Sequence, residues 1–152
     1  MSKQFRDYQL YFDGSCQVNP GGPGGWGFYI VDTETRNRIA EGYGMLPESE
    51  HLTNNVAEWT ALVEGIKWLA FQRTHPVDKL EVFGDSDMVI KQARGEWKCK
   101  KDHLREFHRD LLILVDGMEY GTIAFEWIPR EENSQADLLS RKALDRVIYK
   151  NR

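Results

Sequence analysis

Four carboxylates in this sequence stand at positions from which an acidic cluster could assemble: Asp13, Glu58, Asp85 and Asp137. Gathered in one place they would repel one another, and burying them is costly unless a cation compensates their charge. A ligand set made only of oxygens, without cysteine or paired histidine, suits Mg²⁺ or Mn²⁺ rather than zinc. Two such ions roughly 4 Å apart can hold the attacking and leaving oxygens of an in-line phosphoryl displacement. The set therefore indicates metal-assisted hydrolysis of a phosphodiester.

Each of these acids also has an ordinary structural interpretation when it is taken alone. Asp13 could start a turn, and Glu58 could be a favourable acid near a helix N-terminus. Asp85 could be the N-cap of the helix that follows it. Asp137 could form an i,i+4 ion pair with Arg141. The functional interpretation therefore depends on whether the fold brings the four acids together.

Two of the acids are predicted to end strands. Residues 8–13 alternate between two faces, and Gly14 then breaks the run, which leaves Asp13 at the C-terminal end of the strand. Residues 80–84 form a second such strand, which stops on Asp85. We expect these two strands to be parallel neighbours with their C-terminal ends at the same edge of the sheet. Ligand sites of α/β sheets collect at that edge.

The other two acids lie on predicted helices. Thr53 is a plausible N-cap for a helix that runs to about Phe71 and whose apolar residues fill an arc of roughly 140°. Glu58 lies just outside that arc, near the boundary between helix and sheet. The turn at 129–134 leads into a final helix that carries Asp137 in its first turns. Its apolar stripe consists of Ala136, Leu139, Ala143 and Val147.

The remaining pattern predicts an α/β fold. Residues 28–31 and 38–45 are predicted strands on either side of a turn, and 122–128 is the fifth strand. Further helices are expected at 88–94 and around 104–115. This order gives one five-stranded mixed sheet, three antiparallel strands followed by parallel crossovers, with helices on both faces. The apolar positions of the helix around 104–115 are Leu104, Phe107, Leu111, Leu112 and Val115.

The glycine-rich segment 19–27 formally matches the dinucleotide-binding pattern GxGxxG at Gly22, Gly24 and Gly27. That motif must open a helix, whereas residues 28–31 continue as a strand, so we reject the dinucleotide interpretation. No lysine follows a glycine run, which excludes a P-loop. A hairpin connection, or a close approach of the backbone to a ligand, accounts better for the glycines.

Composition bounds the class of protein. The 152 residues, 41% hydrophobic, predict a single domain over 1–152 with a core at about 8–147. Every apolar run is shorter than the roughly 18 residues that span a bilayer, and the N-terminus lacks the apolar region of a secretory signal. Cys16 and Cys99 form no metal-ligand spacing and fit a reducing cytosol better than a disulfide. We expect a cytoplasmic protein without membrane association, and nothing in the sequence demands more than a monomer.

The charge is unevenly distributed. A net charge of −4 argues mildly against a nucleic-acid partner. Between Lys91 and Arg109, however, seven basic residues against three acidic ones give +4 and leave −8 for the rest of the chain. A basic segment on an acidic protein is compatible with phosphate contact. A solvated helix face is the alternative.

Six blocks of the sequence, spread over roughly residues 8–145, resemble ribonuclease HI in their order and spacing. They are Tyr11-Phe12-Asp13-Gly14-Ser15-Cys16, Asn19-Pro20-Gly21, Gly24-Gly25-Trp26-Gly27, Thr53-Asn54-Asn55-Val56-Ala57-Glu58, Gly84-Asp85-Ser86 and Asn133-Ser134-Gln135-Ala136-Asp137. Together the blocks are far more specific than any one of them. The resemblance implies an endonuclease that cuts the RNA strand of RNA–DNA hybrids and leaves 5′-phosphate and 3′-hydroxyl ends.

The resemblance also implies roles for individual residues. Asp13 would bridge two Mg²⁺ ions, for which Mn²⁺ could substitute, and Asp137 would complete the ion that activates the attacking water. Glu58 and Asp85 would hold the second ion near the leaving 3′ oxygen, with Glu58 also touching a ribose 2′-hydroxyl. Thr53 would help to seat a DNA phosphate. The positions that match contacts to the minor groove of the hybrid are Cys16, Asn19, Asn54 and Asn55.

Three features depart from the family pattern. Many members carry a histidine in the loop before the last helix, thought to assist product release. The loop 128–133 has none, and we hypothesise that Arg130 takes over some of that role by contacting the scissile phosphate. Asp87 stands where some members have a neutral amide that contacts substrate. The extended basic handle of some members is reduced to 91–101, with Trp97 for stacking on a sugar or base, so we expect weaker hybrid affinity and a steep salt dependence.

Two alternatives stand beside this interpretation. A nuclease of the same fold with broader specificity, which also cuts double-stranded RNA, is the nearest one. The acidic cluster fits both enzymes, but the predicted minor-groove contacts favour hybrids, because a protein can recognise RNA by its 2′-hydroxyl groups. A non-catalytic hybrid-binding module would keep Asn54 and Asn55 while losing a carboxylate, and this chain has all four.

Overall fold

The computed structural model describes residues 4–150, and the side chains of all of these except 143 and 145–150. Five strands form one sheet in the order β3-β2-β1-β4-β5. The β1–β2 and β2–β3 pairs are antiparallel, and the β1–β4 and β4–β5 pairs are parallel. In chain order the elements are β1 (Arg6–Cys16), β2 (Gly24–Asp32), β3 (Arg38–Leu46), α1 (Asn54–Gln72), β4 (Val77–Gly84), α2 (Asp87–Ala93), α3 (Asp102–Asp116), β5 (Tyr120–Trp127), the 3₁₀ helix η1 (Arg130–Glu132) and α4 (Ser134–Lys150).

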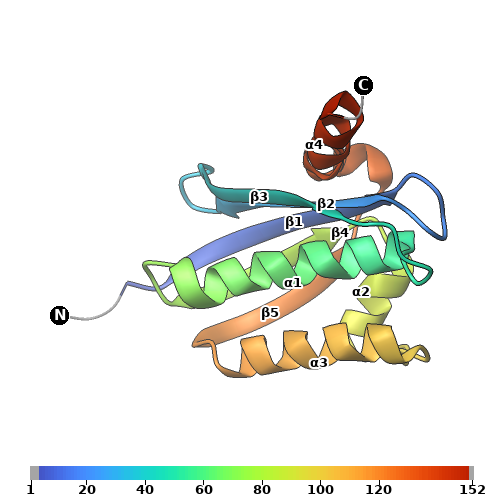
Figure 1. Ribbon diagram of the computed structural model, residues 1–152. Coiled ribbons are helices and arrows are strands. Elements are labelled where there is room, and N and C mark those ends of the chain that lie inside the picture. The colour runs from blue at the N-terminus through green and yellow to red at the C-terminus, as the bar shows by residue number, and fades with distance from the viewer. Residues whose placement is uncertain (1–3, 151–152) are drawn as a thin grey trace.

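The sheet separates two layers of helices (Figure 1). Helices α1 and α3 lie on one face, and α4 lies on the other, across β1, β2 and β3. The predicted element order, the mixed sheet and the parallel pairing of β1 with β4 are all confirmed. In the part of the chain that the structure describes, no helix is long and apolar enough to cross a membrane.

The main core lies between the sheet and α1. Alternate residues of β1 enter it, and α1 presents a buried stripe at helical spacing, because side chains three and four residues apart share one helix face. Thr53 caps α1 as predicted, since its side-chain oxygen accepts a hydrogen bond from the backbone N–H of Val56 at 3.3 Å. The largest fully buried side chains of these two elements are Leu10, Phe12, Trp59, Leu62, Ile66 and Leu69.

The first strand does not end at Asp13, as the sequence had predicted. It continues to Cys16, because residues 13–16 stay paired with β2, from Asp13 opposite Gly27 to Cys16 opposite Gly24. The parallel pairing with β4 stops earlier, at Tyr11 opposite Phe83. Asp13 therefore lies on a part of β1 that has a partner strand on one side only. Gly14 does not break the strand.

Three further predictions need correction. The N-cap of α2 is Ser86 rather than Asp85, because the Ser86 hydroxyl accepts the hydrogen bond from the N–H of Val89 at 3.3 Å. Leu112 is 55% exposed and does not belong to the buried stripe of α3. The stripe of α4 contains Leu144 besides the predicted Ala136 and Leu139. Two further members of the predicted stripe, residues 143 and 147, lie outside the described side chains.

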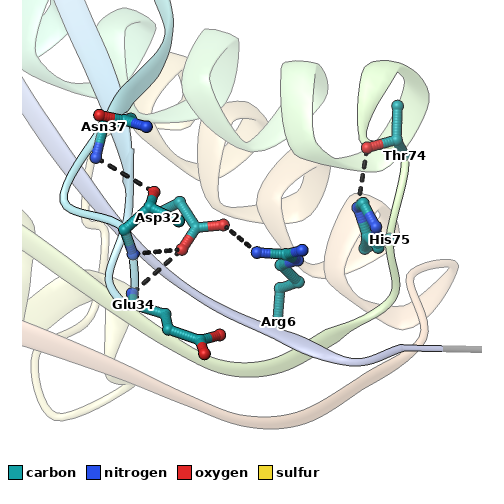
Figure 2. Close-up of polar contacts among 7 residues, drawn as sticks. Arg6, Asp32, Glu34, Asn37, Thr74 and His75 are labelled. Carbon is teal, nitrogen blue, oxygen red and sulfur yellow. Dashed lines mark hydrogen bonds and ion pairs between the residues drawn. The ribbon is translucent and has the colours of Figure 1, made fainter.

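A buried ion pair connects β1 and β2 at the end of the sheet far from Asp13 (Figure 2). Arg6 Nη1 lies 3.2 Å from Asp32 Oδ2, and Asp32 is only 6% exposed. The backbone N–H groups of Glu34 and Thr35 donate to Asp32 Oδ1 at 3.0 and 3.2 Å. Asp32 thus closes the turn between β2 and β3 while its charge is balanced by a guanidinium.

Candidate active site

Three of the four predicted carboxylates converge at one place. One carboxylate oxygen each from Asp13, Glu58 and Asp85 lies within 4.8 Å of the others. They stand in a cleft of about 610 Å³ that Asp137 also lines. The fold therefore brings all four acids to one cleft, with three of them in direct reach of a single ion.

Glu58 reaches Asp13 because α1 lies directly on the backbone of β1. A Cβ atom on Gly14 would collide with the backbone of Ala57 and Glu58, so only glycine permits this close approach. Burial raises the pKa of the Glu58 carboxyl, and the nearby backbone N–H of Gly14 opposes that rise. The glycine after Asp13 thus serves helix packing, and through it the spacing of two acids.

Asp85 lies in the short connection between β4 and α2, where two tethers hold it. The side-chain amide of Asn133 donates to Asp85 Oδ2 at 3.3 Å and to the carbonyl of Phe12 at 2.9 Å. The indole N–H of Trp127 donates to the main-chain carbonyl of Asp85 at 3.0 Å. Asn133 is fully buried and joins β1, the Asp85 connection and the start of α4.

Asp137 is placed by the packing of α4 on β2. A Cβ atom on Gly27 would collide with Leu139 and Ser140, and one on Gly25 with Ser140. These glycines, predicted to serve a hairpin or a ligand, instead let a helix lie close to the sheet. The Asp137 carboxylate forms the predicted ion pair with Arg141, at 3.1 Å, and still faces the cleft. Asp137 therefore both forms the ion pair on the helix surface and lines the cleft.

The electrostatics of the cluster favour a bound cation. Burial, followed by the charge of Asp85, raises the pKa of Asp13 to about 8. Burial also raises the pKa of Glu58 well above its usual value, with Asp13 and Asp85 adding to the effect. The pKa of Asp85 is raised by burial as well, against the opposing effects of Asn133 and Arg130. Such shifts arise when anions are desolvated together without a compensating charge.

One buried oxygen points to the same conclusion. Glu58 Oε2 is shielded from solvent and has no hydrogen-bond partner among the described residues. A buried acceptor without a donor is costly, and a metal ion would satisfy it. The donor set consists of carboxylate oxygens only, which is the preference of hard divalent ions. The residues present therefore fit a divalent metal ion.

Arg130 opens η1 and lines the same cleft. Its charge is close enough to Asp85 to lower the pKa of that carboxyl, although burial outweighs it. The structure thus places the predicted replacement for the missing loop histidine beside the acidic cluster. Arg141 brings a second guanidinium to the cleft wall.

The predicted substrate-binding residues surround the N-terminus of α1 in adjoining depressions. Cys16 and Asn54 line the acidic cleft. Asn19 is tied to this helix end, because the backbone N–H of Asn54 donates to its side-chain oxygen at 3.3 Å. Asn55 and Trp97 line a second depression with Thr53, close to Lys98, Lys100 and Lys101. The six predicted residues therefore line three depressions, the third of which contains Asn19 and Thr53.

Trp97 and Asp87 are linked through Lys91. The Lys91 ammonium lies 4.4 Å from the centroid of the Trp97 ring and 3.1 Å from an oxygen of Asp87. Trp97 remains 47% exposed. Asp87 is thus engaged by a neighbouring cation on the helix surface, outside the group formed by Asp13, Glu58 and Asp85.

Sequence reasoning missed two residues that hold the site together, Asn133 and Trp127. Asn133 carried a signal, since an asparagine directly before a helix often satisfies nearby backbone groups. For Trp127 the sequence signal was weak, because it consisted only of a tryptophan at the end of an edge strand. Their partners, the carbonyls of Phe12 in β1 and of Asp85 just after β4, are far away in the sequence.

Comparisons with known proteins agree on one family. A family model described as reverse transcriptase-like matches residues 11–143. The chain is 34% identical to a ribonuclease H of Saccharopolyspora erythraea, over 90% of this chain and 89% of that protein. It is 32% identical to a ribonuclease H of a Wolbachia strain, over 95% and 98% of the two chains.

A solved structure extends the likeness to three dimensions. The structure of LC11-RNase H1 in complex with an RNA/DNA hybrid superposes with a TM-score of 0.83 at 31% identity, covering 93% of this chain and 99% of that one. The chain spans 34% of the length of the mycobacterial relatives that it matches, and 63% of a ribonuclease HI from Halobacterium salinarum.

Proposed function

The chain belongs to the ribonuclease H family, and from this premise we propose that it is an endonuclease that hydrolyses the RNA strand of RNA–DNA hybrids. The products are 5′-phosphate and 3′-hydroxyl ends. The observation that carries the proposal is the close group of buried Asp13, buried Glu58 and half-buried Asp85 at the wall of an open cleft. A group so costly to bury is expected where it binds a cation for chemistry.

We propose Mg²⁺ as the metal, as two ions held by Asp13, Glu58, Asp85 and Asp137, with Mn²⁺ as a substitute. When bound, the metal supplies a nucleophilic water and positive charge at the reacting phosphate. The chain's own contribution is to hold four acids in fixed places. Gly14, Asn133 and the Asp137–Arg141 pair fix their spacing before substrate arrives.

Arg130 is proposed to contact the scissile phosphate. It is a permanent cation on the rim of the cleft, and a guanidinium can bind two phosphate oxygens at once. In this position it would orient the phosphate and balance charge that builds up on it. It would not transfer a proton at neutral pH, because an arginine stays protonated.

Substrate recognition is assigned to the region around the N-terminus of α1. Cys16, Asn19, Asn54 and Asn55 would contact the minor groove, where hydrogen bonds to 2′-hydroxyl groups distinguish RNA from DNA. The DNA strand would pass Thr53 and Trp97, next to Lys98 and Lys100, which supply charge for phosphates. We further propose a cytoplasmic monomer, in keeping with the free thiols of Cys16 and Cys99.

The test is cleavage of an end-labelled RNA–DNA hybrid in the presence of Mg²⁺. Matched double-stranded RNA and DNA duplexes serve as substrate controls. We expect cutting of the RNA strand of the hybrid alone, abolished by chelator and by Asp85→Asn. Asp78→Asn is the matched variant, because Asp78 is an exposed acid at the other end of the same strand. It should cut like the wild type.

Two outcomes would contradict the proposal. Equal cutting of double-stranded RNA would make the protein a ribonuclease of broader specificity. Tight binding of the hybrid without cutting of any substrate would make it a binding module in which the acids have lost their catalytic role.

A further inference from the structure

Asp85 occupies a half-buried junction in the backbone. β4 ends at Gly84 and α2 begins at Asp87, so Asp85 belongs to neither element. The backbone N–H of Val89, which would bond to the Asp85 carbonyl if the helix began earlier, is bound to the Ser86 hydroxyl instead. The donor to the Asp85 carbonyl therefore comes from outside both elements.

Trp127 supplies that donor. In the parallel ladder it is opposite Gly84, and its indole N–H extends one residue further, to the carbonyl of Asp85 at 3.0 Å. The backbone N–H of Ile128 donates to the Gly84 carbonyl at 2.9 Å, so the end of β5 holds both residues in succession. The Trp127 side chain is 50% exposed, and core packing alone is therefore a weak reason for a tryptophan here.

We propose that Trp127 is a positioning residue for the metal site, which acts by fixing the peptide of Asp85 so that its carboxylate faces Asp13 and Glu58. Asn133 holds the carboxylate end of the same residue, and the two tethers together leave Asp85 one orientation. Loss of the indole N–H frees the carbonyl, lets the junction turn, and weakens metal binding. This inference rests on the proposed function only in taking the acidic group to be a metal site.

The test measures metal binding directly. Mn²⁺ is titrated calorimetrically into the full chain, as wild type, as Trp127→Phe, and with β-(3-benzothienyl)alanine at position 127, which keeps the ring size and removes the N–H. We expect both altered chains to show a dissociation constant for Mn²⁺ raised by about threefold to tenfold, the typical effect of one lost hydrogen bond. Trp68→Phe is the matched control. Trp68 lies on α1 about 15 Å along the helix from Glu58 and packs on the core, so this variant should bind Mn²⁺ like the wild type.

A cleavage assay with the same proteins separates the possible failures. The concentration of metal that gives half-maximal cutting should rise by the same factor, while turnover at saturating metal and KM for the hybrid stay within about twofold. Unchanged Mn²⁺ affinity in both altered chains overturns the role of Trp127. So does a raised KM for the hybrid with unchanged metal affinity, which would make Trp127 a substrate contact. If the wild type binds Mn²⁺ but cuts no hybrid, the proposed function fails while the positioning role can still be measured.

Discussion

Acids are buried at two opposite ends of the same sheet, and, among the described residues, the chain supplies a counter-charge at only one of them. Asp32, at one end, has a guanidinium at 3.2 Å and two backbone N–H donors (Figure 2). Asp13, Glu58 and Asp85, at the other end, crowd together, and the described part of the chain offers none of them an ion pair with a basic side chain. Asp13 follows Arg6 by seven positions in β1, about 23 Å along an extended strand.

The difference separates a structural acid from a functional one. Where an acid serves the fold, the chain supplies its counter-charge, because an unpaired buried anion is costly. Where the chain supplies no counter-charge, repulsion among the acids lowers the stability of the fold, and a cation from solution is needed to offset it. The raised pKa values of all three clustered carboxyls are the signature of that absence.

The largest effect is expected from Asp13→Asn. Asp13 is central to the cluster, and even residues that merely orient a metal ligand change activity or affinity by 10–100-fold. We therefore expect a loss of hybrid cleavage of at least about 100-fold. Single-turnover cleavage at saturating Mg²⁺ measures it. Activity within a few-fold of the wild type would show that the acidic group is not the reaction centre.

The same acid should make the metal-free protein less stable as pH rises. The folded-state pKa of Asp13, about 8, lies above the value of 3.8 that this carboxyl should show in the unfolded chain. Between those values the folded protein retains a proton that the unfolded chain has released, so the free energy of unfolding falls as pH increases. We expect a decrease on the order of 3–4 kcal/mol from pH 5 to pH 8.

Urea denaturation in chelator, at several pH values, measures this decrease. Asp13→Asn should have a flatter profile and be more stable than the wild type at pH 8, although it is inactive. Added Mg²⁺ should remove most of the decrease in the wild type alone. A wild-type profile no steeper than that of Asp13→Asn would mean that the acidic group is not under electrostatic strain.

At the other end of the sheet, where Asp32 has a counter-charge, removing a charge should lower the free energy of unfolding instead of raising it. Arg6→Met removes the counter-charge of Asp32 and should lower the free energy of unfolding by about 2 kcal/mol at pH 7, a value reduced from that of a fully buried pair because the Arg6 side chain is 23% exposed. Cleavage at a temperature where both proteins are folded should be unchanged. Lys67→Met, which breaks an exposed pair with Glu64, is the matched control and should change stability by less than about 1 kcal/mol. Equal effects of the two changes would show that Asp32 needs no counter-charge.

The smallest effect is expected from Arg130→Ala. Arg130 is a partial counter-charge for the acidic cluster, since it acts on Asp85 without an ion pair at close range. We expect turnover to fall by about tenfold, the value of one charge-assisted hydrogen bond to the phosphate. Arg130→Lys should recover part of the rate. If Arg130→Ala leaves turnover untouched, Arg130 has no part in the reaction.

Much of this organisation could be predicted from the sequence, because strand alternation, helical spacing and cap residues are local signals. The parallel pairing of β1 and β4 followed from element order, and with it the meeting of Asp13 and Asp85. Glu58 and Asp137 followed from their places on the predicted helices, and the resemblance to ribonuclease HI added the role of each acid toward the metal ions. The helix around Asp137 and its pair with Arg141 were also accessible, since i,i+4 neighbours are set by helix geometry alone.

The rest could not be predicted, because it depends on contacts between distant segments. Gly14 was interpreted as the end of a strand, whereas it is the contact point of α1 on β1. Gly25 and Gly27 were assigned to a hairpin or a ligand, whereas α4 lies on them. The tethers from Asn133 and Trp127 end on main-chain carbonyls, which no pattern of side chains reveals.

The contact at Gly14 also affects how variation in this protein should be read. In a library of single substitutions, positions that tolerate no change are usually taken for catalytic groups. Gly14, Gly25 and Gly27 have no side chain that could take part in chemistry, yet any larger residue would push a helix and its acid away from the cleft. Substitutions at these glycines should be tolerated as poorly as substitutions at the carboxylates. A map of such positions would therefore contain both the residues that position the site and those that take part in its chemistry.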